Sequence, residues 1–387
     1  MTEKRTSGTQ LKRFLISLSV CGMAVIFIMV AAEGGSYLWL LRHSPKKTAS
    51  AGPPSLVGGE SWSSEYVRES PTAEQTQYRP YVIWRRAPFS GKTINVDADG
   101  IRKTWYTSCG PGDRTIWMFG DSAVWGAGSP DWETIPSHLA KLYSDSGHGV
   151  CVKNFGEKGW VSTQETIQLM LALKRATKQP DLVIFYDGVS DSVVRYPSDV
   201  ADSHTNFDAM KTIVEEGPSE HRAGFAYLKH SNTYHVLGML QKQFRASAAS
   251  PEKTRPGLSI ADVSASTSDN YQKNIEIVEA LSQHYGIRCL FVWQPVLFVS
   301  DKPLSQDEQA IVRTSENELH PGTSQVIQAT YDRVKGISRP DFLYLGDVFS
   351  AEAGTMFVDF RHASPEGNRI IAGRIFEFAQ RPDVYRP

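Results

Sequence analysis

The amino-acid sequence predicts an α/β domain, a three-layer α/β/α sandwich around a five-stranded parallel sheet, preceded by one transmembrane helix. Five short apolar runs lie between residues 115 and 348, and stretches of helical periodicity separate them. Each run is continuous rather than alternating, as expected for strands that helices cover on both faces. In addition, an uncharged segment of 19 residues near the N-terminus is long enough to cross a membrane.

The uncharged segment is Phe14–Ala32, and apolar character resumes after Glu33, so we expect a membrane anchor over residues 14–41. Basic residues before it favour a cytoplasmic N-terminus at residues 1–13. The protein is then a single-pass membrane protein whose remaining chain is extracytoplasmic, and periplasmic if bacterial. A cleaved signal peptide is the competing interpretation, because Val30-Ala31-Ala32 offers a small-residue cleavage site.

Residues 42–77 are rich in Ser, Pro and Gly and are interpreted as a linker to a domain over residues 78–387. The domain opens with short strands and turns, with Asp99-Gly100 as a turn signal. The five apolar runs predict strands at 115–120, 150–156, 181–188, 288–295 and 341–348. Helical patterns lie at 135–143, 163–176 and 270–285. The long gap before the fourth strand is interpreted as a lid-like insertion at about 195–268, with a helix over 223–244.

The composition excludes several classes of partner. A formal net charge of −1 and the lack of a basic stripe argue against nucleic-acid binding. Outside the membrane segment, which contains Cys21, the cysteines are Cys109, Cys151 and Cys289, without metal-ligand spacing. Cys109 and Cys151 each lie just before or at the start of a strand, so a disulfide between them is one expectation, and free thiols are the alternative. The histidines are scattered, and neither a metal nor another cofactor is expected.

A serine, a histidine and an aspartate follow strands of the predicted sheet. Ser122 comes directly after the first strand, and Asp359 and His362 follow the fifth strand, three residues apart. Ligands bind outside the carboxyl ends of parallel strands, so these side chains are expected at one edge. A serine hydroxyl becomes nucleophilic when a base takes its proton and a third group orients that base. Asp359 would orient Nδ1 of His362, leaving Nε2 to face Ser122.

Three segments resemble the sequence blocks of the SGNH (GDSL-type) hydrolase superfamily. They read FGDSAVWG, NFGEKGW and DFRHASPEGNRIIA, and an upstream INVDADGIR resembles a segment found before the serine block in membrane-anchored or envelope members. The resemblance covers roughly residues 78 to 380. It implies a flavodoxin-like sheet, a catalytic triad of Ser122, His362 and Asp359, and an oxyanion N–H from a glycine. Spacing from the Asn of the second block favours Gly159 over Gly156 for that donor.

The third block departs from the family pattern. The family has Gly-x-Asn-Asp, whose Asn donates to the oxyanion, whereas this chain has Gly188-Val189-Ser190-Asp191. Loss of one oxyanion donor can lower a rate by ~10²–10³. The expected oxyanion hole therefore consists of the N–H groups of Ser122 and Gly159, with or without Ser190.

Several further residues at the same edge are candidates for substrate binding. Trp125, Trp132 and Trp160 follow catalytic-edge strands, where an aromatic face can stack on a sugar or hold an acyl chain; core packing is the alternative. Trp125 and Trp160 are favoured. Asp191 either orients the site or caps a helix. Gln294 either lines the pocket or belongs to a turn.

These features predict a membrane-anchored, extracytoplasmic serine esterase that cleaves an O-acyl ester, with an acylated envelope glycan or lipid as the expected substrate. An O-acyltransferase that acetylates a polysaccharide would use the same triad. A non-catalytic subunit of an envelope assembly complex, with envelope protein partners, is the alternative from another class, and Ser190 at the Asn position is its best support.

Overall fold

The computed structural model of the protein describes residues 4–43, 60–194, 196, 203–216, 231–233, 236, 259–319 and 321–382. The chain divides into two compact units. One unit combines residues 1–50 with 208–253, and the other combines residues 51–207 with 254–387. The insertion helix expected over 223–244 lies largely outside the described residues.

The first unit contains helix α1 (Lys4–His43) and nearly all of helix α7 (Phe207–Glu216). Within α1, the stretch Lys12–Leu40 is long and apolar enough to cross a membrane. Glu33, the one charged residue of the predicted anchor, has partners inside this unit. Its carboxylate accepts hydrogen bonds from the backbone N–H groups of Asn232 (2.5 Å) and Thr233 (3.2 Å), and from both of their side chains. The charge in the apolar stretch is thus satisfied by hydrogen bonds.

The second unit is built on a five-stranded parallel sheet in the order β6-β5-β7-β8-β9. Its strands are β5 (Arg114–Gly120), β6 (Val150–Asn154), β7 (Leu182–Asp187), β8 (Arg288–Trp293) and β9 (Phe342–Tyr344). This is the flavodoxin-like order, and it confirms the predicted fold class. The strand order changes direction between β5 and β7, because β6 lies on one side of β5 and β7 on the other. Open α/β sheets bind their ligands in the crevice at such a point.

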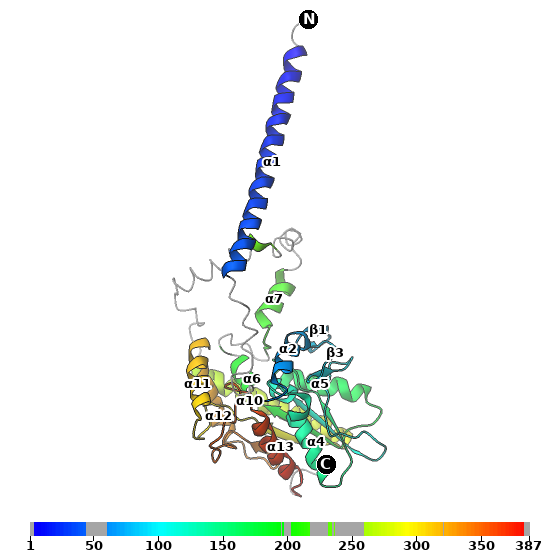
Figure 1. Ribbon diagram of the computed structural model, residues 1–387. Coiled ribbons are helices and arrows are strands. Elements are labelled where there is room, and N and C mark those ends of the chain that lie inside the picture. The colour runs from blue at the N-terminus through cyan, green and yellow to red at the C-terminus, as the bar shows by residue number, and fades with distance from the viewer. Residues whose placement is uncertain are drawn as a thin grey trace. The chain divides into compact units, whose positions relative to one another are not determined.

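Helices cover both faces of the sheet (Figure 1). On one face α4 packs against α13, and on the other α10 packs against both α5 and α12. The helices of this unit are α2 (Ser63–Ala73), α3 (Ser122–Trp125), α4 (Ile135–Asp145), α5 (Ser162–Arg175), α6 (Val189–Val194), α10 (Ile260–Tyr285), α11 (Gln306–Glu318), α12 (Thr323–Val334) and α13 (Pro365–Ala379), with a 3₁₀ turn η1 (Asp131–Glu133). Ser or Thr side chains cap the N-termini of α4, α10, α11 and α13.

A row of phenylalanine rings crosses the sheet near the carboxyl ends of its strands. Phe119 of β5 stacks between Phe155, which follows β6, and Phe185 of β7, at centroid separations of 4.8 and 5.0 Å. Phe291 of β8 continues the row at 5.8 Å from Phe185. All four rings belong to the main core. Such aromatic pairs stabilise the fold beyond the burial of their apolar surface. They therefore hold in place the strand ends that are followed by the polar residues.

Part of the segment expected as linker is folded. Helix α2 packs Tyr66 and Ala73 into a small core with Trp125. The Glu69 carboxylate accepts the backbone N–H groups of three successive residues, Lys92, Thr93 and Ile94. The Ser-rich composition hid this helix because few of its side chains are apolar. Two small hairpins follow, β1 (Thr76–Arg79) with β2 (Ile83–Arg86), and β3 (Phe89–Ser90) with β4 (Asn95–Val96).

Cys109 and Cys151 form a disulfide, which confirms that expectation. It ties the segment before β5 to the edge strand β6. Cys289 is a free thiol in the core, and burial raises the pKa of this thiol to about 12, so it is inert at neutral pH.

Candidate active site

Ser122 lies at the end of the central strand. The last five residues of β5 are buried, and α3 begins at Ser122 itself. The Asp121 carboxylate caps this short helix by accepting the backbone N–H of Ala123 across 2.8 Å. Gly126 ends the helix in the left-handed region, where a Cβ would lie 2.4 Å from the side chain of Thr134. The serine is therefore presented on a turn whose two ends are both fixed.

Asp359 and His362 lie on the loop between β9 and α13. A bridge between Phe357 and Ala363 closes this loop, and Val358 N–H donates to the His362 carbonyl across 2.9 Å. Ser364 then caps α13 through the N–H of Gly367. The loop is thus held between the bridge and the capped helix.

The structure brings Ser122, His362 and Asp359 together in one hydrogen-bonded chain. His362 Nδ1 lies 2.6 Å from Asp359 Oδ2, and His362 Nε2 lies 2.7 Å from Ser122 Oγ. An ionised carboxylate only accepts hydrogen bonds, so we assign the ring proton to Nδ1, which leaves Nε2 to accept the serine O–H. Ser122 and His362 are buried, with exposed fractions of 5% and 7%.

The environment of Asp359 favours its ionised form. Burial raises the pKa of this carboxyl, but the charge and hydrogen bond of His362, followed by the charge and backbone N–H of Arg361, lower it well below its usual range. The side chain is 41% exposed, so solvent weakens each of these effects without changing their direction. Asp359 therefore stays a carboxylate and fixes the His362 tautomer.

The two backbone N–H groups expected to form the oxyanion hole are free of hydrogen bonds within the described part of the chain. The described residues provide no hydrogen-bond acceptor for the N–H of either Ser122 or Gly159. Gly159 has φ +80°, a conformation that suits glycine. By contrast, the N–H of Gly156 donates to the Asn154 side chain across 3.0 Å. A Cβ at Gly156 would lie 2.3 Å from the backbone nitrogen of Trp125, so this glycine allows close packing on α3.

The hydroxyl of Ser190 is already engaged. It donates a hydrogen bond to Asp121 Oδ2 across 2.6 Å. A hydroxyl has one proton to donate, so Ser190 in this arrangement offers none to an oxyanion. Asp121 consequently links the turn after β5 to the first turn of α6.

The favoured tryptophans are not exposed to a ligand. Trp125 and Trp160 are both fully buried, and each packs under an arginine: Arg102 lies 4.4 Å from the Trp125 ring and Arg85 lies 4.8 Å from the Trp160 ring. This placement contradicts the expected substrate contact, because cation–π packing and the small N-terminal cores occupy both rings. Trp132 is half-buried.

Asp191 and Gln294 are also buried. Asp191 Oδ1 accepts both the N–H and the hydroxyl of Ser162, at the start of α5, so it satisfies donors at a helix N-terminus. Gln294 is 1% exposed, and no described residue makes a hydrogen bond with its amide. Neither side chain reaches the surface at the serine.

A buried carboxyl pair lies next to Asp191. Glu165 of α5 and Asp187 at the end of β7 are fully buried and interact electrostatically, and within the described residues their carboxyl oxygens accept no hydrogen bond from an N–H or hydroxyl group. Burial, and then the charge of Asp187, raise the pKa of Glu165 well above its usual value; burial and the charge of Asp191 do the same for the pKa of Asp187. Two interacting carboxyls buried at this depth do not both stay ionised, so the pair holds a proton. No sequence pattern indicates this pair, since each residue alone matches a solvated helix or turn position.

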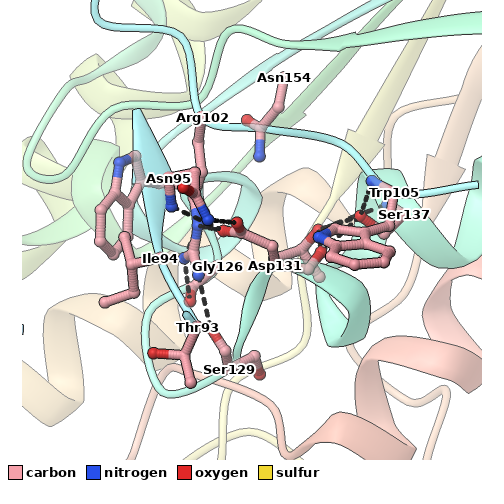
Figure 2. Close-up of polar contacts among 12 residues, drawn as sticks. Thr93, Ile94, Asn95, Arg102, Trp105, Gly126, Ser129, Asp131, Ser137 and Asn154 are labelled. Carbon is pink, nitrogen blue, oxygen red and sulfur yellow. Dashed lines mark hydrogen bonds and ion pairs between the residues drawn. The ribbon is translucent and has the colours of Figure 1, made fainter. Parts of the chain in front are cut away.

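A second group of residues missed from the sequence supports α3 from behind. The Arg102 guanidinium donates to the carbonyls of Trp125, Gly126 and Ser129 at 2.7–2.8 Å, and its Nε lies 2.9 Å from Asp131 Oδ1. Figure 2 shows this network, in which Asn95 and Ser137 also contact Asp131. Arg102 belongs to the INVDADGIR segment, so its resemblance to a family segment could have identified it from the sequence. No sequence pattern points to its partner Asp131.

Metal-ligand geometry is lacking in the part of the chain that the structure describes: no three His, Cys, Asp or Glu side chains are arranged to hold an ion. The site brings together a serine hydroxyl, an imidazole and a carboxylate within hydrogen-bond reach of one another. These groups together suit acyl transfer through a covalent serine ester.

No protein-family model and no curated protein matches the chain. Among solved structures, a member of the lipolytic protein G-D-S-L family from Veillonella parvula DSM 2008 has 13% identity and a TM-score of 0.37, over 69% of this chain and 100% of that chain. An acetyl xylan esterase, AlAXEase, has 15% identity and a TM-score of 0.35, over 68% and 98%. Axe2, an acetylxylan esterase from Geobacillus stearothermophilus, has 13% identity and a TM-score of 0.32, over 72% and 99%. The chain is thus similar, at low identity and low TM-score, to G-D-S-L lipolytic proteins and acetyl xylan esterases.

Proposed function

We propose that the protein is a membrane-anchored serine ester hydrolase of the SGNH type. The observation that carries the proposal is the hydrogen-bonded chain Ser122–His362–Asp359, with distances of 2.7 and 2.6 Å. Nucleophile, base and orienting carboxylate within hydrogen-bond reach are the geometric signature of an activated serine. Their place at the carboxyl ends of β5 and β9 in a parallel sheet supports the same interpretation.

In the proposed reaction, Ser122 Oγ attacks the ester carbonyl while His362 Nε2 takes the hydroxyl proton. The imidazolium is stabilised by Asp359 and returns the proton to the departing alcohol. Water then attacks the acyl-enzyme, giving its proton to His362, and the acid leaves as Ser122 regains its hydrogen. The N–H groups of Ser122 and Gly159 stabilise the oxyanion in both steps, helped by the positive N-terminal end of α3.

The proposed substrate is an O-acyl ester of an envelope glycan or lipid. The apolar stretch Lys12–Leu40 supports an anchor that keeps the domain at a membrane. Because the apolar sequence continues after Glu33, an uncleaved anchor is preferred to a signal peptide. The positive residues before it support an extracytoplasmic catalytic domain.

The test is turnover of p-nitrophenyl acetate by the full chain in detergent, next to Ser122→Ala and His362→Ala. Ser146→Ala and His148→Ala are matched controls, because they remove a surface Ser–His hydrogen bond of 3.0 Å. Turnover that is lost only in the first two variants supports the proposal. Neither turnover nor labelling by a fluorophosphonate would refute it and favour a non-catalytic subunit. Labelling without turnover would favour an acyltransferase that awaits its acceptor.

A further inference from the structure

Arg361 lies between the two catalytic side chains in sequence and is partly exposed. Its backbone N–H donates to Asp359 Oδ1 across 2.9 Å, so its position is fixed by the same carboxylate that orients the histidine. Its guanidinium forms no ion pair or hydrogen bond within the described part of the chain, and its Nε is buried without a partner. The guanidinium packs over the Phe360 ring, 5.2 Å from its centroid.

This arrangement differs from that of the structural arginines of the same domain. Arg102 is fully buried and donates to three carbonyls and one carboxylate. Arg85 donates to the carbonyls of Phe155 and Gly100. A guanidinium carries five N–H donors in a planar fork, which suits carboxylates and phosphates. The guanidinium donors of Arg361, a residue next to the catalytic histidine in sequence, have no acceptor among the described residues. A structural role therefore does not explain this arginine.

Lys158 is a second cation, and its charge interacts with that of Arg361. It precedes Gly159, and its Nζ pairs with Glu74 across 2.6 Å. Burial lowers the pKa of Lys158, Glu74 raises it, and the positive charges of Arg86 and Arg361 lower it further. Arg361 and Lys158 therefore lie within each other's field, and Glu74 is engaged by the lysine. Asp359 in turn accepts from His362 Nδ1 and from two backbone N–H groups.

We propose that Arg361 binds an anionic group, a carboxylate or a phosphate, that the substrate carries close to its scissile ester. The inference rests on the proposed esterase function and adds the class of substrate. An anion at this position fills the unused fork and is attracted by the charge of Lys158, while the hydrogen bonds that Asp359 accepts from His362 and from two backbone N–H groups offset part of its repulsion. A neutral ester leaves the guanidinium without a partner.

The experiment compares three monoacetates of methyl glucoside, methyl glucuronoside and methyl glucoside 6-phosphate, acetylated at the same hydroxyl. Acetate release by the full chain in detergent gives kcat/KM for each. Calorimetric binding to the full-length Ser122→Ala protein gives affinities without any turnover. A charge-assisted pair predicts about 10- to 100-fold preference for the glucuronate or the phosphate over the neutral ester. The preferred one of the two identifies the anion.

In Arg361→Gln the ratio of anionic to neutral ester is expected to fall towards one, and Arg361→Lys should give an intermediate ratio. Arg374→Gln, which removes an exposed pair with Glu377 on α13, is the matched control and should keep the wild-type ratio. Equal affinities for all three esters in the Ser122→Ala protein, or an unchanged ratio in Arg361→Gln, would overturn the inference. Anion preference in binding with no acetate release from any ester would refute the esterase function and leave the anion site standing.

Discussion

The Ser190 hydroxyl donates its hydrogen bond to the Asp121 carboxylate, 2.6 Å away, at the position where the family pattern has an oxyanion-donating Asn. Asp121 also caps α3 through the Ala123 N–H. The short side chain of Ser190 thus joins the turn that carries the nucleophile to α6. An Asn amide has two N–H donors and could serve both partners, whereas serine has one.

Ser190→Ala is therefore expected to lower kcat for p-nitrophenyl acetate by less than about tenfold, since no oxyanion donor is removed. The hydrogen bond to Asp121 is lost, so a small loss of stability, about 1 kcal/mol, should accompany it. A fall in kcat of ~10²–10³ with unchanged KM would contradict this expectation and show that the hydroxyl turns to the oxyanion.

Asp359→Asn should reduce kcat by ~10²–10⁴, because the amide cannot hold His362 in the tautomer that leaves Nε2 free. The wild-type pKa of Asp359 lies below its usual range, so its stabilising effect is present above the unfolded pKa and is lost as the pH falls into the acid range. Steady-state hydrolysis of p-nitrophenyl acetate measures the fall in kcat. A rate within threefold of wild type would show that Asp359 does not orient the base.

The buried carboxyl pair Glu165–Asp187 predicts how stability varies with pH. Burial raises the pKa values of both carboxyls well above their usual range, and it raises the pKa of Asp191 to about 6. Carboxyls with raised pKa values stabilise the fold fully below their unfolded pKa, and the effect is lost as the pH rises through the folded pKa. We expect the melting temperature to fall as the pH rises from roughly 4, the pKa of an unfolded carboxyl, to about 6, where Asp191 loses its proton. It should fall further at the higher pH at which the Glu165–Asp187 pair loses its proton.

Glu165→Gln should flatten that decline, because the amide keeps a donor to Asp187 and cannot ionise. Thermal melts from pH 5 to 9 measure the slope, with Glu377→Gln, an exposed carboxyl paired with Arg374, as the control. A slope identical to wild type in Glu165→Gln would mean that the pair does not share a proton.

The five strands and the residues after them were predictable because burial on both faces leaves a continuous apolar run. The hydrogen-bonded arrangement of Ser122, His362 and Asp359 was predictable as well, since Ser122 and His362 each come after such a run in a family-like order. The partners of charged and aromatic residues were not predictable. Trp125 is buried because Arg102 covers it, and the link from Arg102 to Asp131 joins residues from separate loops. Likewise, α2 is stabilised by tertiary contacts of Tyr66 and Glu69 rather than by a periodic apolar face.

The Cys109–Cys151 disulfide closes a loop with a sequence separation of 42 residues, for which the chain-entropy model gives about 4 kcal/mol. Replacing both cysteines by serine should therefore lower the free energy of unfolding by a similar amount, and reductant should lower the wild-type melting temperature. Cys289→Ser, which removes the buried free thiol, is the control. It measures the effect of replacing a sulfur atom by oxygen where no disulfide is lost. Reductant that leaves the wild-type melt unchanged would contradict the prediction.

The Arg102–Asp131 pair should be among the most costly to break in the domain. Both side chains are fully buried, and the guanidinium also holds the carbonyls of Trp125 and Gly126 at the end of α3. Removing one partner of a buried pair leaves an uncompensated charge, so Arg102→Ala or Asp131→Ala should each cost about 3–5 kcal/mol. Because α3 carries Ser122 at its other end, kcat should also fall in the variants that still fold.

A double-mutant cycle distinguishes the pair from simple loss of packing. If the two charges depend on each other, the double variant should be less destabilised than the sum of the single variants by more than about 1 kcal/mol. Arg369 and Glu366, a largely exposed pair on α13, provide the reference, with an expected coupling below about 1 kcal/mol. Equal coupling in the two cycles would mean that Arg102 supports α3 through its carbonyl contacts alone, with Asp131 serving only as a cap for neighbouring donors.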